Sequence, residues 1–241
     1  KQAFDTVEMP KSKIAGIVVL TMELARFSSP SAEALVRDDM IAAIAEFSDK
    51  QFIDPAVAAV AGTNPGSITN GATAVAATGT TLAAIEADLL AARMHMVNAN
   101  IPLAGCYWVM NTEKRMKLEE LRTSQDVLAF PSLSTNGTLK GIPVIDSTAV
   151  GDFDLDTGDA GAVAAKPYIA LISAPQVLVA DDGQVMLDAS SEASIVMDDA
   201  PTGFSLTSLW QRNMIGIRAE RLVHWLRRRT QAAYVIANCD Y

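Results

Sequence analysis

The sequence predicts an α+β protein, because its helical and strand-like segments are segregated along the chain instead of alternating regularly. A strand-like region comes first, followed by a long helical segment, a second helix, a strand and a short helix. Several strand-like runs then fill the rest of the 241 residues. Half of the residues are hydrophobic and 20% are charged, so the chain can bury a sizeable core, in one large domain or two interleaved ones.

The first twenty residues predict a strand, a turn and a second strand. Residues 4–9 carry spaced apolar side chains, and residues 14–20 form a β-rich run. That run is also the longest uninterrupted apolar segment, and it is too short to span a bilayer. No signal peptide is visible. Because the sequence begins with Lys1 and not Met, we expect a processed product or a trimmed version of a longer chain.

The clearest helix follows. Ser29 is a good N-cap and Pro30 suits the first helical position, so a helix should run over residues 30–53, ahead of Pro55. At 1.5 Å per residue it would be about 35 Å long. Its expected buried face carries Ile41, Ala45, Ser48 and Phe52, with Met40, Ile44 and Phe47 beside them.

The middle of the chain predicts a loop, a helix and a strand-to-helix junction. Residues 62–80 are poor in charge and rich in Gly, Thr, Asn and Ala, as expected of a loop. The next helix has apolar side chains at helical spacing, which are Leu82, Ile85, Leu89 and Met96. The strand 106–110 then leads to Asn111, which can cap a short helix that continues to Leu121.

The rest of the chain predicts mainly strands. A turn at Asn136-Gly137 leads to a compact strand over residues 139–145. Two or three strands should lie between 168 and 187, around a hairpin turn at 181–183. Two more β-rich runs, at 214–226 and 232–237, close the chain.

Charge is distributed unevenly along the chain. The formal net charge of −9 argues against sequence-independent DNA binding, which needs a basic face. Residues 150–199 hold ten acidic side chains and one base, whereas residues 212–229 hold six arginines and one acid. Opposite patches can dock copies of a subunit onto one another, or they can pair within one chain. The charges alone do not decide between the two.

No arrangement of residues typical of an active site is found. The two histidines, His95 and His224, lie in apolar surroundings, and no G-x-S-x-G elbow is present. The acidic segment 152–163 lacks the glycine and the final glutamate of an EF-hand, so a solvated acidic loop is the better interpretation. Cys106 and Cys239 do not suggest a disulfide framework, and they make no metal-ligand pair with the histidines. We therefore expect reduced thiols, no cofactor and no metal.

Short motifs occur in order along almost the whole chain. T-M-E-L at 21–24 precedes the long helix, and N-P-G at 64–66 lies in the loop after it. W-V-M-N at 108–111 joins a strand to a helix, and residues 139–144 follow the pattern L-x-G-x-P-V. The run S-L-W-Q-R-N-M-I-G-I-R-A-E at 208–220 comes near the end. In this order the motifs resemble the major capsid proteins of tailed phages, the Hong Kong 97 type.

The resemblance implies a capsid fold with a long spine helix, a peripheral domain, an axial domain and an extended loop. On this basis we expect the following division: extended loop, residues 1–13; peripheral domain, residues 14–79 and 204–229, with the spine helix at about 30–53; axial domain, residues 80–203 and 230–241.

The resemblance also implies a structural role and no enzymatic activity. We expect a major capsid protein of a phage or prophage that self-assembles into pentamers and hexamers and forms an icosahedral head around double-stranded DNA. Its partners would be other copies of itself and, during assembly in the host cytoplasm, a scaffold, a prohead protease and a portal. DNA would lie inside without specific binding, and no membrane would be involved. The alternatives are an encapsulin-like nanocompartment shell of the same fold, or an enzyme whose site is not recognised.

The residues that we expect at contacts between subunits are charged. They are Lys11 and Lys13 in the extended loop, Asp152, Asp154 and Asp156 in the acidic segment, and Arg227, Arg228 and Arg229 in the basic one. Some members of the family crosslink an extended-loop lysine to an asparagine of a neighbour, roles that Lys11 or Lys13 and Asn213 could fill. We predict that no such crosslink forms.

Overall fold

The structure is a computed structural model that describes residues 9, 12–23, 30–60, 63–153, 155, 166–197 and 205–241. These residues fall into two compact units. The unit that we call the sheet unit contains residues 9, 49–60, 63–153, 155, 166–180 and 224–241. The ribbon unit contains residues 12–23, 30–48, 181–197 and 205–223. The predicted strand over residues 4–9 lies almost wholly outside the described residues.

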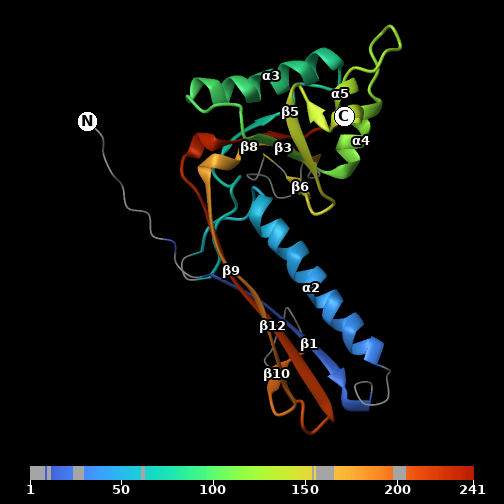
Figure 1. Cartoon of the computed structure of the whole chain (residues 1–241), viewed down its shortest axis with the longest axis vertical. Coiled ribbons are helices and arrows are strands. Elements are labelled where there is room, and N and C mark those ends of the chain that lie inside the picture. The colour runs from blue at the N-terminus through green and yellow to red at the C-terminus, as the bar shows by residue number, and fades with distance from the viewer. Residues whose placement is uncertain are drawn as a thin grey trace, which may run out of the picture. The chain divides into compact units, whose positions relative to one another are not determined.

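A six-stranded mixed sheet forms the centre of the sheet unit (Figure 1). Its strands, in order across the sheet, are β2 (Thr73–Ala76), β13 (Ala233–Ala237), β8 (Ile169–Ser173), β3 (Cys106–Met110), β5 (Ile142–Asp146) and β4 (Thr138–Leu139). β8 is antiparallel to both β13 and β3, whereas β2 runs parallel to β13 and β5 runs parallel to β3. Every residue of β8 and β13 is buried, which explains why both strands are apolar apart from Ser173 at the end of β8.

Helix α3 (Leu82–Asn98) covers one face of this sheet. Its N-cap is Thr81, whose hydroxyl oxygen accepts a hydrogen bond from the backbone N–H of Ala84. The buried side of the helix packs on alternate residues of β3, so that Trp108 is fully buried. The Trp108 indole N–H donates to the carbonyl oxygen of Leu139, 3.1 Å away, and this bond satisfies the polar atom in the core.

Two short helices follow β3. The side chain of Asn111 caps α4 (Thr112–Glu120), as predicted, by accepting a hydrogen bond from the Glu113 N–H at 2.9 Å. α5 (Pro131–Asn136), which the sequence analysis did not predict, ends at Gly137 in the left-handed conformation. The sheet unit also contains the two-stranded pair β6 (Asp152–Phe153) and β7 (Lys166–Pro167), and the 3-10 turns η1 (Ala174–Gln176) and η2 (Thr230–Ala232).

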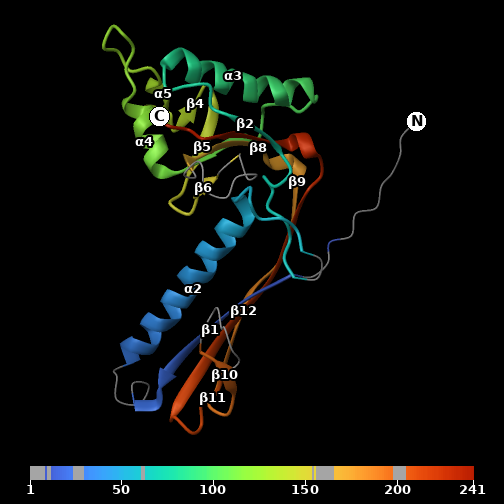
Figure 2. The same ribbon diagram turned by 180° about the vertical axis from the view of Figure 1, so that it is seen from behind.

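A three-stranded antiparallel ribbon forms the ribbon unit. The strand order is β1 (Lys13–Thr21), β12 (Met214–Arg227) and β9 (Val177–Ser190), and Figure 2 shows these long strands from behind. A separate pair, β10 (Ser194–Val196) and β11 (Leu206–Ser208), belongs to the same unit. Helix α2 (Pro30–Ile53) has the predicted bounds, and its residues before Asp49 pack in this unit.

The predicted buried face of α2 is partly wrong. Met40 and Ile44 are buried against Ala219 of β12, with Ile14 and Val18 of β1 beside them. Ile41 is 43% exposed and Phe47 is 50% exposed, although both were expected to lie inside or next to the core. The helix has apolar residues on more than one face, so its periodicity could not select the face that meets the ribbon.

Three other predictions of local structure need correction. The segment 62–80 is not all loop, because it contains β2, which pairs with β13. Residues 139–145 form two strands and not one, joined at Lys140 and Gly141, both with positive φ. Residues 181–183 do not make a hairpin turn, because β9 runs through them without interruption. Gly183 has φ +69°, so a turn-like conformation is present inside a continuous strand.

Asn111 allows a test of how α4 is positioned. Its side chain caps the helix and also donates to the carbonyl oxygen of Val150 at 2.7 Å. We expect Asn111→Ala to lower the free energy of unfolding by about 1–2 kcal/mol, because both bonds are lost. Asn111→Ser keeps a cap and loses only the second bond, so it should cost about half as much. Urea denaturation measures both values, and equal losses would contradict a contribution from the cap.

Candidate functional site

Two ion pairs join β9 to β12 in the ribbon unit. The guanidinium of Arg218 lies 2.9 Å from the carboxylate of Asp188, and Arg221 pairs with Asp181. Part of the acidic segment therefore neutralises part of the basic segment within one chain. The sequence left open whether the opposite charges pair within one chain or between copies. For these four residues the structure shows pairing within one chain.

Electrostatics at Asp181 follow from its two hydrogen-bond donors. The Arg221 guanidinium donates to the Asp181 carboxylate, and the Gly183 backbone N–H donates to Oδ1 at 3.0 Å. These bonds stabilise the charged form and hold the pKa of Asp181 below its usual value. The Arg221 pKa is raised in turn by the same partner.

The three consecutive arginines have different surroundings. Arg227 is half-buried, and its guanidinium donates to the carbonyl oxygens of Ile68 at 2.6 Å and Asn70 at 3.0 Å. Burial lowers the pKa of this guanidinium. Arg228 and Arg229 are exposed, and Arg229 donates to the Ala99 carbonyl oxygen at 3.3 Å. Arg227 thus has a role inside the sheet unit, whereas Arg228 and Arg229 remain available at its surface.

The other predicted interface residues are only partly described. Lys13 begins β1, and its ammonium lies 3.5 Å from the carboxylate of Glu220. Asp152 is exposed on β6. Lys11, Asp154 and Asp156 lie outside the described residues. The place of all these candidates at contacts between copies stays a prediction.

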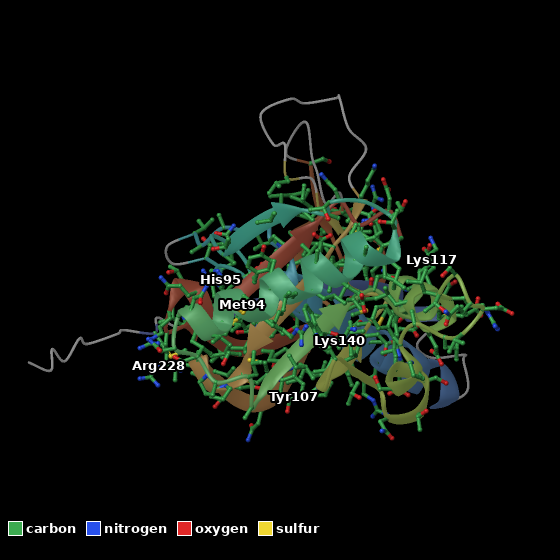
Figure 3. All side chains as sticks on the ribbon, turned by 90° about the horizontal axis from the view of Figure 1, so that it is seen from above. Met94, His95, Tyr107, Lys117, Lys140 and Arg228 are labelled. Atoms are coloured by element: carbon green, nitrogen blue, oxygen red, sulfur yellow. The ribbon has the colours of Figure 1, made fainter. Side chains whose placement is uncertain are left out.

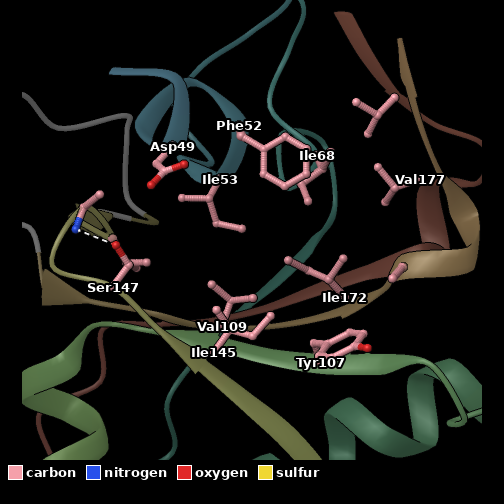
Figure 4. A pocket seen from close by; sticks show the side chains of 14 residues that line it. Asp49, Phe52, Ile53, Ile68, Tyr107, Val109, Ile145, Ser147, Ile172 and Val177 are labelled. Carbon is pink, nitrogen blue, oxygen red and sulfur yellow. Dashed lines mark hydrogen bonds between the residues drawn. The ribbon is translucent and has the colours of Figure 1, made fainter. Parts of the chain in front are cut away.

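An apolar groove opens beside the sheet, on the face that carries Tyr107, Val109 and Ile172 (Figure 4). Its volume is about 370 Å³, and Phe52 and Ile53 of α2 lie across it from the sheet. Phe52 packs edge-on against Trp225, with ring centroids 5.3 Å apart. The wall consists almost entirely of aliphatic and aromatic side chains. Such a lining suits the packing of apolar groups better than acid–base chemistry.

His95 does not line this groove. It lies on α3, where Figure 3 labels it, and its ring centroid is 5.1 Å from that of Tyr234. Burial lowers the pKa of His95. His224 lies on β12, as predicted. Within the described ranges, no three His, Cys, Asp or Glu residues are placed to hold a metal ion. No helix in this part of the chain is long and apolar enough to cross a membrane.

A second apolar face on α3 was not predicted from the sequence. The apolar residues that pack on the sheet were predicted, but Leu90, Met94 and Val97 are exposed on the opposite side. Apolar residues on two opposite sides of the helix are the signal that could have revealed this face.

Solved phage structures share this fold. A structure from Mycobacterium phage Adephagia matches with a TM-score of 0.68 and 12% identity, over 97% of this chain and 73% of that one. A structure from Gordonia phage Cozz matches with a TM-score of 0.65 and 17% identity, over 100% of this chain and 77% of that one. The capsid of a native GTA particle matches with a TM-score of 0.69 and 14% identity, over 97% and 75%. The chain therefore has the Hong Kong 97 capsid fold, and the predicted α+β class is confirmed.

Sequence comparison then identifies the family. The model of the phage capsid family matches residues 1–235, so the chain belongs to the phage capsid family. The capsid polyprotein of Pseudomonas phage PAJU2 is 38% identical over 244 residues, which is 99% of this chain and 35% of that protein. The chain thus spans about a third of the length of this curated relative. The resemblance predicted from the order of the motifs is confirmed.

The unequal roles of Arg227 and Arg228 predict unequal effects of mutation. Arg227→Ala leaves two carbonyl oxygens without their charged donor, and we expect it to lower the free energy of unfolding by about 1.5–3 kcal/mol. Arg228→Ala, the matched control, should change it by less than about 0.5 kcal/mol. Urea denaturation compares the two variants, and similar values for both would contradict the assigned role of Arg227.

The Asp181–Arg221 pair predicts a dependence on pH. Because the pKa of Asp181 is lowered in the folded state, its contribution is complete above the ordinary aspartate pKa and is lost as the pH falls through the folded value. Asp181→Asn should lower the free energy of unfolding by about 0.5 kcal/mol at pH 7, since the pair is partly exposed. The difference from wild type should disappear at strongly acidic pH. Asp182→Asn is the control, and a pH-independent loss in Asp181→Asn would exclude an ionic contribution.

Proposed function

We propose that this protein is the major capsid subunit of a phage or prophage, and that it self-assembles into the pentamers and hexamers of an icosahedral head around double-stranded DNA. The observation that carries this proposal is the match of the phage capsid family model to residues 1–235. The Hong Kong 97 fold supports it independently. Both named sequence matches are to phage capsid proteins, which favours a phage head over the shell of a cellular compartment.

The charged residues that remain at the surface are proposed to set the register between copies. Arg228 and Arg229 are exposed on the sheet unit, and so is Asp152. Exposed ion pairs are weak individually, but charge complementarity steers docking and disfavours wrong registers. A net charge of −9 is compatible with DNA that is enclosed and not bound, because the shell needs no basic inner face to confine it.

The proposal extends to the partners and the place of assembly. A scaffold, a prohead protease and a portal would act with the subunit in the host cytoplasm, and the finished protein would reside in the virion capsid. The subunit itself would be structural and would perform no catalysis. The ribbon unit would contribute to the peripheral domain and the sheet unit to the axial domain. Residues 181–197 group with the ribbon unit, which would extend the peripheral domain beyond the range expected from sequence.

The prediction that no lysine–asparagine crosslink forms also stands as part of this proposal. Within one chain, Lys13 pairs with Leu222 at one end of the β1–β12 ladder, and Asn213 adjoins Met214 at the other. Nine steps of about 3.3 Å separate Leu222 from Asn213 along the strand, so a bond between Lys13 and Asn213 within one chain is excluded. A ladder of covalent multimers from assembled shells on a denaturing gel would contradict the prediction.

Assembly can be observed directly. We expect the protein expressed from its complete gene to form closed shells or capsomer rings, visible by negative-stain electron microscopy and as fast species in sedimentation velocity. A discrete monomer or dimer that never assembles would refute the proposed function.

A charge-matched pair of variants tests the arginines within the same experiment. Arg228→Glu combined with Arg229→Glu should reduce the yield of shells, because the glutamates would then repel the acidic residues, Asp152 among them, that the arginines are proposed to meet on another copy. Lys117→Glu combined with Arg122→Glu changes the net charge equally at exposed sites on and just after α4. Shell yields that fall equally in both double variants would assign the effect to net charge and not to a contact.

A further inference from the structure

Trp210 is a large apolar side chain that the subunit leaves in water. It is 75% exposed, whereas the other two tryptophans of the chain, Trp108 and Trp225, are 0% and 3% exposed. It belongs to the motif S-L-W-Q-R-N-M at 208–214, and the described part of the chain does not cover it. Tryptophan is enriched among the residues that dominate the energy of protein interfaces. The exposed indole is therefore a candidate anchor for a partner.

Hydrogen bonds hold the turn that carries Trp210, between β11 and β12. The Met214 N–H donates to the Leu209 carbonyl oxygen at 2.9 Å and closes the turn. The Leu209 N–H donates to a carbonyl oxygen just before β10 at 3.0 Å, and the Met22 N–H donates to the Asn213 carbonyl oxygen at 2.9 Å. These two bonds tie the turn to neighbouring segments. A turn fixed in this way loses little conformational freedom when its side chain binds a partner.

A small apolar pocket lies next to this turn, within the ribbon unit. Its volume is about 350 Å³, near the lower end of the range of ligand pockets. Its apolar lining comes from β1, β9, β10 and β12 and from the turn, and it includes Ile17, Ala189, Ile195, Gly216 and Leu209. Asp188 and Arg218, which pair with each other, also line it. A pocket of this size and lining suits one large side chain better than a drug-sized molecule.

Gly216 keeps part of this pocket open. It is buried in β12 and its φ is not positive, so the backbone conformation does not require glycine there. A Cβ at this position would lie 3.1 Å from the Leu209 side chain, so a larger residue would press on the pocket wall. Glycine inside a strand weakens it, and it often marks a place where a ligand or another chain approaches closely. The glycine is therefore a second observation that points to an occupant.

The chemistry of the pocket fits the indole of Trp210. The pocket offers aliphatic surface to the ring, and the Arg218 guanidinium can stack on its face. The side-chain oxygens of Asp188 and Ser190 can accept from the indole N–H, which needs a partner when a tryptophan is buried. Because the Trp210 side chain is exposed, it does not occupy the pocket of its own chain. The occupant that fits is Trp210 of a second copy.

The symmetry of such a contact follows from its two different surfaces. A contact of an anchor with a pocket is heterologous, and repeating it by rotation closes a ring. Leu209 lines the pocket and directly precedes Trp210, so both surfaces lie near the axis of that ring. Only a few bulky subunits fit around an axis so close to their contacts. In a shell of pentamers and hexamers, three capsomers meet at every corner, and the proposed function places the ribbon unit in the peripheral domain.

We propose that Trp210 of one copy inserts into the pocket of a second copy, and that three copies, one from each of three adjoining capsomers, close a ring of such contacts. The inference rests on the proposed function, since it assigns a contact that joins capsomers. It leaves the contacts around the pentamer and hexamer axes to other surfaces. One side chain in one pocket is a small contact, so each is weak alone and three act together in the closed ring.

Tryptophan fluorescence measures the burial of the anchor directly. Trp108 and Trp225 are buried within the subunit, so the difference between wild type and Trp210→Phe isolates the exposed indole. When the protein expressed from its complete gene assembles into shells, this difference signal should shift to shorter wavelength, and its quenching by acrylamide should fall severalfold. Shells in which the Trp210 indole stays as accessible to acrylamide as in unassembled capsomers would overturn the inference.

Paired cysteines test the symmetry of the contact. Gln211→Cys adjoins the indole and Ala189→Cys lines the pocket, and both positions are exposed. In shells that carry both substitutions, a short bismaleimide should give dimers and trimers on a denaturing gel and no larger species. Either substitution alone should give severalfold fewer multimers, and wild type, in which Cys106 and Cys239 are buried, is the control for background. A ladder that reaches five or six subunits would place the contact inside capsomers and contradict the proposal.

Removal of the anchor should separate two levels of assembly. Trp210→Ala should lower the yield of closed shells by at least about tenfold, as expected for the loss of a dominant interface residue, and should leave capsomer rings. Met116→Ala, 58% exposed on α4, is the matched control and should change neither yield. The urea midpoint of Trp210→Ala should equal that of wild type, because the side chain is exposed. Normal shells from Trp210→Ala would refute the role of the indole.

The outcomes separate this inference from the proposed function. Shells with a protected Trp210 indole, and with trimers from the paired cysteines, support both. Well-formed shells in which the indole stays accessible, or in which the paired cysteines give no more multimers than wild type, overturn the inference and leave the capsid proposal intact. If wild type forms no shells at all, the proposed function fails, and the inference fails with it.

Discussion

The packing of the sheet unit depends on the hydrogen bonds that the carbonyl oxygen of Ile53 accepts at the end of α2. It accepts hydrogen bonds from the hydroxyls of Tyr168, at 3.0 Å, and Thr69. A helix leaves its last carbonyl groups unpaired, and burying one without a donor is costly. Next to it, Phe52 packs on Trp225, whose indole N–H donates to the Gly66 carbonyl oxygen at 2.9 Å. Segments from four parts of the chain thus meet at one helix end.

Local chemistry allowed α2 and β3 to be located from sequence, and long-range pairing explains what was missed. Prolines mark both ends of α2, and a short apolar run that ends at the capping residue Asn111 marks β3, so both were predicted with the bounds that the structure has. β2 has no comparable signal, because it is a strand only by virtue of pairing with β13, which lies far away in the sequence. Residues 181–183 have the composition of a turn, yet the long partner strand β12 keeps β9 extended through them.

In the candidate site, too, local features can be predicted from the sequence, whereas long-range pairing cannot. The sequence identifies where acidic and basic residues are concentrated, but not which of them neutralise one another. Arg221 and Arg227 are used within the chain, whereas Arg228 is exposed, although all three belong to one basic segment. The exposed apolar residues of α3, Leu90, Met94 and Val97, could be recognised only once the structure showed which side of the helix packs on the sheet. A chain can thus use some charges for pairing within itself and leave others exposed, where each makes only a weak contact.

The two ion pairs between β9 and β12 have a mechanical consequence. Arg218 and Arg221 are three residues apart on a strand, so their side chains leave opposite faces of the ribbon, and Asp188 and Asp181 meet them there. The ion pairs therefore link the two strands on both faces of the ribbon. A force that peels β9 away from one end strains the two ion pairs one after the other. A force that slides β9 along β12 strains both ion pairs at once. The ribbon should accordingly resist shear along its length better than it resists unzipping.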